Sequence, residues 1–558
     1  MPPAIRLSRS PVGGAPTVPM PLPHLRSHPL RVSDSKRALT AEPHMSSKDK
    51  IKELQSRREK LMLGGGKDRL EKQHAAGKLT ARERVDALLD HDTFQEFGMF
   101  AEHRATLFGM AGKEAPADGV VTGCGFVDGR PVHIASQDFT VFGGSLGEVH
   151  GDKIVEAMQA SLKTGTPFVF INDSGGARVQ EGIDSLSGYA KVFYHNVMLS
   201  GVVPQISMIC GPCAGGAAYS PALTDFIIQT RFAQMFITGP SVIKQVTGEV
   251  VTPEELGGPE AQMHYSGVVH FIADDDRQAI DICRKLLSFL PANNIEDPPI
   301  VHGDYSLEPD PALNTLIPED PKKAYDVKEV IARVVDAGDF LEVQETYAEN
   351  IVVGFARICG RSIGVIANQP MQLAGVLDIN SSDKAARFIR FCNAFNIPLV
   401  TFVDTPGFMP GVEQEYGGII RHGAKVLFAY SAATVPKVTV ILRKAYGGAY
   451  VAMCAKDLHA DRSFAWPSAE IAVMGAEGAA EIVFKREIEA AEDKAAARQK
   501  FINIYRDTFS TPYVAGARRM VDDIIEPATT RAHIAKALDV LASKRDFRPQ
   551  KKHGLIPL

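Results

Sequence analysis

Residues 165–178 read GTPFVFINDSGGAR, and residues 396–409 read NIPLVTFVDTPGFM. Placed one over the other, the two segments pair a proline, an aspartate and a glycine at a constant spacing of 231 positions, with Asp173 opposite Asp404. Each segment runs from an apolar stretch rich in Val, Ile, Leu and Phe, which favours a buried strand, into a glycine turn. The chain therefore contains two copies of one structural unit.

The duplication continues into a second strand and a second glycine turn. Residues 204–218, PQISMICGPCAGGAA, lie over residues 436–450, PKVTVILRKAYGGAY, at a spacing of 232. The spacing then grows from 236 to 254 before Arg277 meets Arg531, which places an insertion in the charged residues 484–501 of the second copy. A chance alignment does not keep its spacing through two apolar strands and two turns.

Both copies predict an α/β unit with the order strand, helix, strand, turn, helix, strand, glycine turn, helix. Helices that alternate with short Val- and Ile-rich strands indicate βα crossovers and sheets that are largely covered. The predicted domains are residues 46–292 and residues 326–558. Residues 293–325, rich in proline and aspartate, are predicted to link them.

The amino-terminal region differs from the rest of the chain. Residues 1–44 hold nine prolines, six basic residues and two acidic ones, a balance found in transit peptides but too rich in proline for their amphipathic helix. The sequence favours a disordered extension over residues 1–45, or Met45 in place of Met1 as the start of translation. From Ser46 the pattern predicts a helical arm, with Thr80 and Glu83 as a capping box.

Composition excludes several classes of protein. A net charge of −5 and a pI near 6.4 give no attraction to nucleic acid. Seven cysteines, an odd number, favour a reducing compartment over a disulfide framework, and the CxxC of Cys210 and Cys213 has no second pair to complete a zinc site. No apolar run is long enough to span a membrane.

The two glycine turns of each copy predict its chemistry. Glycine lets a ligand approach the backbone, and free N–H groups at a helix start carry partial positive charge. Two such donors from separate turns can converge on one oxygen as an oxyanion hole, where one donor contributes about 3 to 4 kcal/mol when charge develops on a carbonyl. Tight packing of helix on sheet is the alternative reason for such glycines.

The polar residues beside the turns offer no serine triad, metal cluster or clearly placed carboxylate pair. Asp173 and Asp404 are predicted to cap the turns through their own side chains, with a catalytic role as the alternative. Arg178 is aligned with Met409 in the second copy, so the second copy has no matching cation. Arg178 is predicted either to meet a phosphate or to form a surface ion pair.

Several longer segments resemble the carboxyltransferase (β) subunits of biotin-dependent acyl-CoA carboxylases, and the propionyl-CoA carboxylase type most. The match runs in order from about residue 48 to the end. The segments are GGGKDRLEKQHAAGKLTARERVDALL, SQDFTVFGGSLGEVHGDKI, INDSGGARVQEG, GPCAGGAAYSPALTDF, VDTPGFMPGVEQE, RKAYGGAYVAM and FAWPSAEIAVMGAEGAA.

The resemblance implies a crotonase-like ββα spiral in each half, with coenzyme A held by the first half and biotin by the second half of another subunit. It implies carboxyl transfer from carboxybiotin to the α-carbon of an acyl-CoA, with biotin as the base. The residues that it assigns to the two oxyanion sites are Ala177, Gly215, Gly216, Phe408, Gly448 and Ala449. Those that it places around the bound groups are Ser174, Gly175, Gly176, Arg178, Gly407 and Gly447.

The resemblance also implies partners and leaves alternatives. Biotin attachment and ATP-dependent carboxylation are expected on a separate α subunit, with this chain as a hexamer and without a metal. Val451 is the candidate specificity residue, because propionyl-directed members often have Asp there and acetyl-tolerant members an apolar residue. The alternatives are an acetyl- or broad acyl-CoA carboxylase subunit, the α subunit of a sodium-pumping methylmalonyl-CoA decarboxylase, an enoyl-CoA hydratase or isomerase, and an inactive scaffold. The expected location is the bacterial cytoplasm, or the mitochondrial matrix if residues 1–45 are a transit peptide.

Overall fold

The computed structural model describes residues 46–558, so the extension predicted for residues 1–45 lies outside the described residues. The described chain divides after Ser56, and the sheets described below belong to the compact unit of residues 57–558. The predicted helices of the arm are present as α1 (Ser47–Met62), α2 (Lys67–Ala75) and α3 (Ala81–Leu88), and the capping box of Thr80 and Glu83 opens α3.

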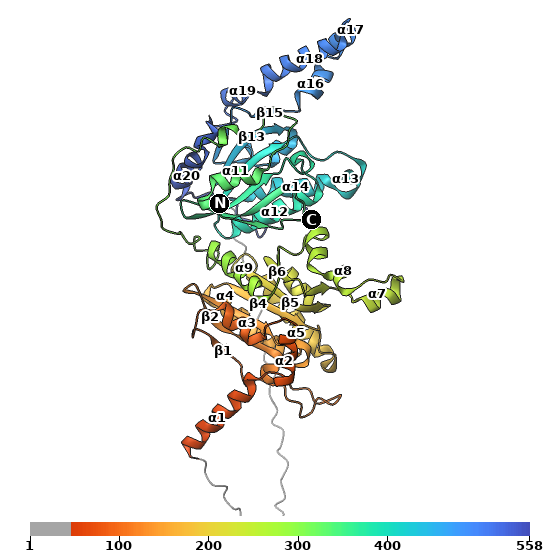
Figure 1. Ribbon diagram of the computed structural model, residues 1–558, viewed down its shortest axis with the longest axis vertical. Helices are drawn as coiled ribbons and strands as arrows, with labels where there is room; N and C mark the ends of the chain where they lie inside the picture. Colours follow the sequence, from red (N-terminus) through yellow and green to blue (C-terminus); the bar gives the residue numbers. More distant parts are fainter. Residues whose placement is uncertain (1–45) are drawn as a thin grey trace, which may run out of the picture. The chain divides into compact units, whose positions relative to one another are not determined.

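The first half is built on one mixed sheet with the strand order β1-β2-β3-β4-β5-β6-β8, and β7 also pairs with β5 (Figure 1). Pairing is antiparallel from β1 to β3 and parallel from β3 onward. The strands are β1 (Gln95–Phe97), β2 (Val120–Val127), β3 (Arg130–Gln137), β4 (Phe168–Ser174), β5 (Gln205–Ala214), β6 (Phe226–Thr230), β7 (Gln234–Phe236) and β8 (Phe271–Ala273). The helices after the arm are α4 (Glu148–Thr164), α5 (Ile183–Leu199), α6 (Gly216–Ala222), α7 (Pro240–Thr247), α8 (Pro253–Gly257) and α9 (Asp276–Phe289).

The second half repeats this sheet in the order β9-β10-β11-β12-β13-β14-β16, with β15 beside β13. The strands are β9 (Phe340–Val343), β10 (Ile351–Ile358), β11 (Arg361–Asn368), β12 (Leu399–Thr405), β13 (Lys437–Tyr446), β14 (Arg462–Ala465), β15 (Glu470–Ala472) and β16 (Asp523–Ile524). The helices, with α10 in the connecting segment, are α10 (Leu313–Leu316), α11 (Val327–Val334), α12 (Ile379–Ala394), α13 (Val412–Gly417), α14 (Ile419–Ala432), α15 (Gly447–Ala452), α16 (Ala476–Val483), α17 (Lys485–Ala490), α18 (Lys494–Tyr505), α19 (Pro512–Ala517) and α20 (Thr530–Leu541).

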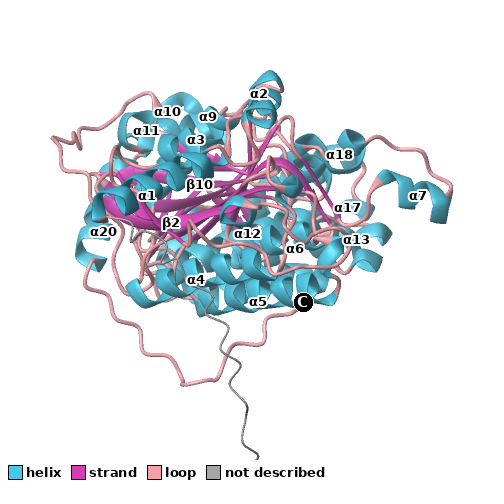
Figure 2. Cartoon of the chain, turned by 90° about the horizontal axis from the view of Figure 1, so that it is seen from below, coloured by secondary structure: helices cyan, strands magenta, loops and turns pink. Residues whose placement is uncertain are grey.

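The duplication predicted from the sequence is confirmed by these matching sheets, in which helices lie on both sides of the strands (Figure 2). The insertion at residues 484–501 forms α17 and most of α18, which pack on α16. The prediction that each copy starts with a single strand is wrong. FVDGRPVHIAS is a β-hairpin, because Asp128 and Gly129 adopt positive φ angles of 50° and 74° and turn β2 back onto β3.

The repeat extends to buried charge. Lys153 in α4 and Lys384 in α12 are 231 positions apart. The ammonium of Lys153 donates to main-chain carbonyls at and just before the start of β2, and that of Lys384 to carbonyls before β10. Burial lowers the pKa of Lys153 to about 8 and that of Lys384 to about 7. Each lysine thereby ties the long helix of its half to the hairpin of its sheet.

The two halves share a core. The ring of Phe226 in β6 lies edge-on to Phe391 of α12 at 4.6 Å and to Phe355 of β10 at 5.8 Å. Arg387 of α12 also donates to the carbonyl of Thr224 at 2.7 Å. Apolar burial and a directed polar contact therefore join the halves, so residues 57–558 form one unit.

The arm is fixed to the first sheet by a buried ion cluster. Arg84 of α3 is fully buried and donates to Asp173 at 3.0 Å and to Asp276 at 2.8 Å. Lys78 donates to the same Asp173 oxygen at 2.7 Å. Since an unpaired buried carboxylate is very unfavourable, these cations are required wherever Asp173 is ionised.

We expect Arg84→Ala to lower the free energy of unfolding by about 3 to 5 kcal/mol, because it leaves the buried Asp276 without its cation and Asp173 with Lys78 alone. Urea denaturation followed by circular dichroism measures this change. Lys60→Ala is the control, since the Lys60–Glu114 pair has side chains 66% and 68% exposed and such pairs contribute little. Equal stability of the two variants would contradict the assignment of the Arg84 cluster as the anchor.

Candidate functional site

The first candidate site lies where β4 and β5 end side by side. Ser174 at the end of β4 is in register with Cys213 of β5, so the two following turns lie at the same edge of the sheet. A Cβ atom at Gly176 would stand 2.9 Å from the carbonyl oxygen of Ala214, so the turns touch through their backbones. Gly176 has a φ of 96°, a value that favours glycine.

Hydrogen bonds fix these turns but leave several backbone donors free. Leu146 pairs with the first turn, donating to the Gly176 carbonyl and accepting from Arg178 N–H, both at 2.9 Å. In the second turn, Gly215 N–H donates to Phe236 at 3.1 Å. Within residues 46–558, the N–H groups of Ala177 and Gly216 have no protein acceptor. They are the donors available to a ligand oxygen.

The second half builds the same arrangement. Thr405 is in register with Ala445, and Leu377 donates to the Gly407 carbonyl at 3.1 Å and accepts from Met409 N–H at 2.7 Å. Among the described residues, the N–H groups of Phe408 and Gly448 are left without an acceptor. The sequence contained no sign of the two leucines, since a single-residue pairing has no periodicity.

Tight backbone geometry accompanies each second turn. Gly215 and Gly447 have φ angles of 60° and 57° at the start of α6 and α15. Gly448 corresponds to Gly216, and a Cβ there would meet only Phe408, at 3.9 Å. Ala449, the other residue predicted beside the second site, is fully buried in the first turn of α15.

The prediction that Asp173 and Asp404 cap their own turns is wrong. Asp173 binds the arm, while Asp404 accepts from Arg443 Nε at 3.0 Å and from Lys444 N–H at 3.1 Å. Burial raises the pKa of Asp404, and Arg443 opposes that rise. Gly211 occupies the place of Arg443 in the first copy, and a Cβ at Gly211 would lie 1.9 Å from Asp173 Oδ1. The cation that pairs with the aspartate thus comes from β13 in the second half and from the arm in the first half.

The predicted phosphate contact of Arg178 is wrong, because this side chain is 1% exposed and already bonded, and the predicted ion pair is present but buried rather than at the surface. It donates to Asp118 at 2.6 Å, to Glu181 at 2.8 Å and to the Ser145 carbonyl at 2.8 Å. Burial raises the pKa of Asp118, and Arg178 opposes that rise. Arg178 therefore supports the first turn from behind and presents no charge to a phosphate.

A cavity of about 500 Å³ opens beside the second site. Apolar side chains line most of it, and Val451, the predicted specificity residue, is 40% exposed there. The lining residues are Gly447, Gly448, Tyr450, Val451, Ile471, Ala472, Val473, Tyr505, Phe509, Val514, Ala515, Arg518 and Met520. Tyr505 and Phe509 were missed in the sequence, because the segment that contributes them follows the insertion and has no aligned counterpart in the first copy.

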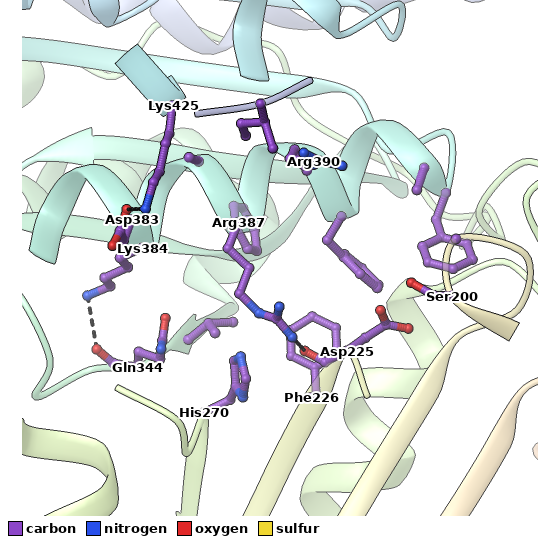
Figure 3. Close-up of a pocket in the computed structure, with 18 of the residues that line it drawn as sticks. Ser200, Asp225, Phe226, His270, Gln344, Asp383, Lys384, Arg387, Arg390 and Lys425 are labelled. Atoms are coloured by element: carbon purple, nitrogen blue, oxygen red, sulfur yellow. Dashed lines mark hydrogen bonds and ion pairs between the residues drawn. The ribbon is translucent and has the colours of Figure 1, made fainter. Parts of the chain in front are cut away.

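Another cavity, of about 590 Å³, lies between the halves (Figure 3). Its cations are largely committed to the protein: Lys384 donates to Gln344, Arg387 to Thr224, and Lys425 pairs with Asp383 at 2.8 Å. This cavity contains neither pair of glycine turns. Of these contacts, that of Arg387 with Thr224 crosses between the halves.

Comparison with known proteins now defines the family. The model of the carboxyl transferase domain matches residues 72–556. This chain belongs to the carboxyl transferase family. The resemblance noted in the sequence and the α/β fold predicted from it are confirmed. As a family member, the chain is an enzyme of the carboxyltransferase type.

Relatives of this carboxyl transferase carry three different names. The methylmalonyl-CoA carboxyltransferase 12S subunit of Propionibacterium freudenreichii subsp. shermanii is 62% identical, over 91% of this chain and 97% of its own length. The methylmalonyl-CoA decarboxylase subunit alpha of Propionigenium modestum is 57% identical, over 91% and 99%. The propionyl-CoA carboxylase beta chain of Saccharopolyspora erythraea is 54% identical, over 91% and 96%.

A solved structure is equally similar to this carboxyl transferase. The crystal structure of transcarboxylase 12S, described as a hexamer assembly with methylmalonyl-coenzyme A and methylmalonic acid bound, has a TM-score of 0.91 and 60% identity. The match covers 93% of this chain and 100% of that one. Within residues 46–558, no helix is long and apolar enough to cross a membrane, and no group of three or more acidic, His or Cys side chains could hold a metal ion.

We expect Gly448→Val to reduce carboxyl transfer at least about 100-fold, because its side chain occupies the space that a bound oxygen needs beside the free N–H groups. The first added atom, the Cβ, meets nothing closer than 3.9 Å, so the loss of activity should exceed any loss of stability. Gly478→Ala in α16, whose Cβ would stand 3.8 Å from Met474, is the matched control. Initial rates and thermal melting separate the two effects, and an unchanged rate in Gly448→Val would support the scaffold alternative.

Proposed function

We propose that this chain transfers a carboxyl group between carboxybiotin, carried by a partner protein, and the α-carbon of propionyl-CoA, whose carboxylated form is methylmalonyl-CoA. The observation that carries the proposal is the pair of free backbone N–H groups repeated at equivalent turns of both halves. One pair suits the oxygen of a thioester and the other the oxygen of a ureido group. The names of the relatives support this pair of acyl-CoA substrates.

In the first half, Ala177 and Gly216 donate to the thioester oxygen. Negative charge builds on that oxygen when the α-carbon gives up its proton to a base, which biotin would supply when bound, and each preorganised N–H then stabilises the charge by about 3 to 4 kcal/mol. The turn of Ser174, Gly175 and Gly176 lies against this position without a bulky side chain, while Gly215 starts α6 at the required angle. Arg178 holds the turn from behind through Asp118.

In the second half, Phe408 and Gly448 donate to the ureido oxygen of biotin, with Gly407, Gly447 and Ala449 shaping the turns. The apolar cavity beside them fits the uncharged ring system of this cofactor, since aliphatic and aromatic side chains line it and two N–H donors stand free at its edge. When bound, biotin supplies the carboxyl group. The residues of the cavity exclude water from the transfer.

The working enzyme joins copies of this chain, in our proposal, with residues 46–292 of one copy facing residues 326–558 of another. Exposed apolar side chains lie near both sites, including Ile183 at 74% and Ile237 at 51% in the first half and Val473 at 77% in the second. The hexamer described for transcarboxylase 12S supports this arrangement. A biotin-bearing α subunit completes the system, in the bacterial cytoplasm.

The direction of the reaction has one serious alternative. The decarboxylase subunit alpha of Propionigenium modestum is 57% identical, so the same site also suits removal of the carboxyl group from methylmalonyl-CoA. A broad acyl-CoA preference is the other alternative, and the apolar Val451 favours it. In each case the acyl-CoA half of the site performs the same task.

The proposed transfer is tested with the purified chain, methylmalonyl-CoA and free biotin at millimolar concentration. We expect chromatography to show biotin-dependent conversion of methylmalonyl-CoA to propionyl-CoA, since the two sites together need both ligands. Absence of conversion in a folded, oligomeric sample would contradict the proposal. Hydration of crotonyl-CoA without biotin would instead favour the hydratase alternative.

The acyl preference is tested at Val451. We expect Val451→Asp to shift the ratio of kcat/KM toward propionyl-CoA and away from butyryl-CoA by about 10-fold. In the proposed assembly the acyl chain held by the first half of the facing copy reaches the edge of this cavity, where a charged side chain disfavours the longer apolar chain. Rates with acetyl-, propionyl- and butyryl-CoA measure the ratio. Val540→Asp, at a residue 70% exposed in α20, controls for the added charge, and an unaltered ratio in Val451→Asp would remove this residue from the specificity argument.

A further inference from the structure

The apolar cavity beside the second pair of turns has one charged residue in its lining. Of the residues that line it, Arg518 alone carries a charge, and the others are glycines or have apolar or aromatic side chains. The cavity volume of about 500 Å³ is in the range usual for sites that bind small molecules. One cation in such surroundings indicates a ligand that combines an uncharged body with a single negative charge.

The fold brings Arg518 to this cavity from a distant part of the chain. Arg518 directly follows α19, which packs against β15. Ala472 of β15 is in register with Tyr446, the last residue of β13, and the turn of Gly447 and Gly448 begins directly after it. The cation and the free N–H group of Gly448 therefore border the same cavity.

The charge of Arg518 is not used inside the protein. Arg518 is exposed, and within residues 46–558 its guanidinium has no hydrogen-bond acceptor and no ion-pair partner. Arg506, which directly follows the lining residue Tyr505, is by contrast paired with Glu477 at 3.2 Å and lies 3.5 Å from Glu470. Arg518 is therefore the cation of this site that is available to a ligand.

The first half has no matching cation. At the spacing of 254 positions that pairs Arg277 with Arg531, the counterpart of Arg518 is His264. The ring of His264 is bonded through Nδ1 to the carbonyl of Thr346 at 3.0 Å, so it is held by the second half of the chain. The available cation is thus a property of the second site, not of the repeated unit.

The ligand proposed for the second site gains a negative charge when it is loaded. The ring system of biotin is uncharged, and carboxylation at N1 adds one carboxylate. A carboxylate inside an apolar cavity is unfavourable unless a cation pairs with it. The planar guanidinium of arginine suits this task, because it donates two parallel hydrogen bonds to a carboxylate.

We propose that Arg518 binds the carboxylate of carboxybiotin while the N–H groups of Phe408 and Gly448 hold the ureido oxygen. Arg518 thereby distinguishes carboxybiotin from biotin and orients the carboxyl group for transfer. The ion pair exists before the bond between N1 and the carboxyl carbon breaks, so it contributes to binding more than to the rate of the chemical step. The inference rests on the proposed function, because that function assigns biotin to the second half.

The test is Arg518→Met, which keeps the length of the side chain and removes its charge. The probes are biotin amide and its N1-carboxylated form, whose dissociation constants are measured by ligand-observed NMR at mildly alkaline pH and low temperature. We expect affinity for the carboxylated amide to fall about 10- to 100-fold, as for lost hydrogen bonds to a charged group, and affinity for biotin amide to change less than about twofold. KM for the carboxylated amide in transfer to propionyl-CoA should rise by the same factor with kcat unchanged. Arg518→Lys should recover part of the affinity, because an ammonium keeps the charge but not the two parallel hydrogen bonds.

The control is Arg519→Met. Arg519 is also exposed but does not line the cavity, so its substitution should leave both affinities unchanged. If the wild-type chain binds neither amide and transfers no carboxyl group, the proposed function fails. If the wild type transfers while Arg518→Met keeps its affinity and KM for the carboxylated amide, the role of Arg518 fails. An equal loss of both affinities together with a changed oligomer mass would also overturn it, by placing Arg518 in a contact between subunits; melting curves show that the variants compared are folded.

Discussion

A backbone N–H group that is to bind a ligand has to be left without a partner inside the protein, and every group around it has to be satisfied so that the turn stays in place. Each half meets this constraint with one leucine of its own. Leu146 and Leu377 each bond the residues on either side of the donor, so that only the N–H of Ala177 or of Phe408 stays free. The neighbouring strand then brings the second donor beside the first through the register of β4 with β5 and of β12 with β13.

The ion pairs below the turns follow from the same constraint, because the buried carboxylates there also have to be satisfied. Asp173 and Asp404 lie at strand ends inside the core, where each needs a cation. The second half supplies Arg443 from the adjoining strand, whereas the first half has Gly211 there and receives Arg84 and Lys78 from the arm. Lys78 and Arg84 of the arm are therefore part of the first half's interior, and their attachment bears directly on the site.

The two copies of the unit have thus diverged, but both keep the free backbone N–H donors at their turns. The first half has a small turn residue and an arm below it. The second has a phenylalanine in the turn and an apolar cavity to which the segment after the insertion contributes Tyr505 and Phe509. These differences suit an acyl-CoA on one side and biotin on the other, which is the division of labour that we propose for this carboxyl transferase.

The sequence by itself determined the duplication, the α/β class, the insertion and the positions of the glycine turns, because these depend on local pattern and constant spacing. It also placed the capping box at Thr80 and Glu83, a purely local arrangement. Only the tertiary structure decided what pairs with what: the bridging leucines, the buried partners of Asp173 and Arg178, and the residues that meet around the apolar cavity. Such contacts join residues far apart in the chain, and hydrogen-bond geometry and burial select them after folding, so no periodicity in the sequence records them.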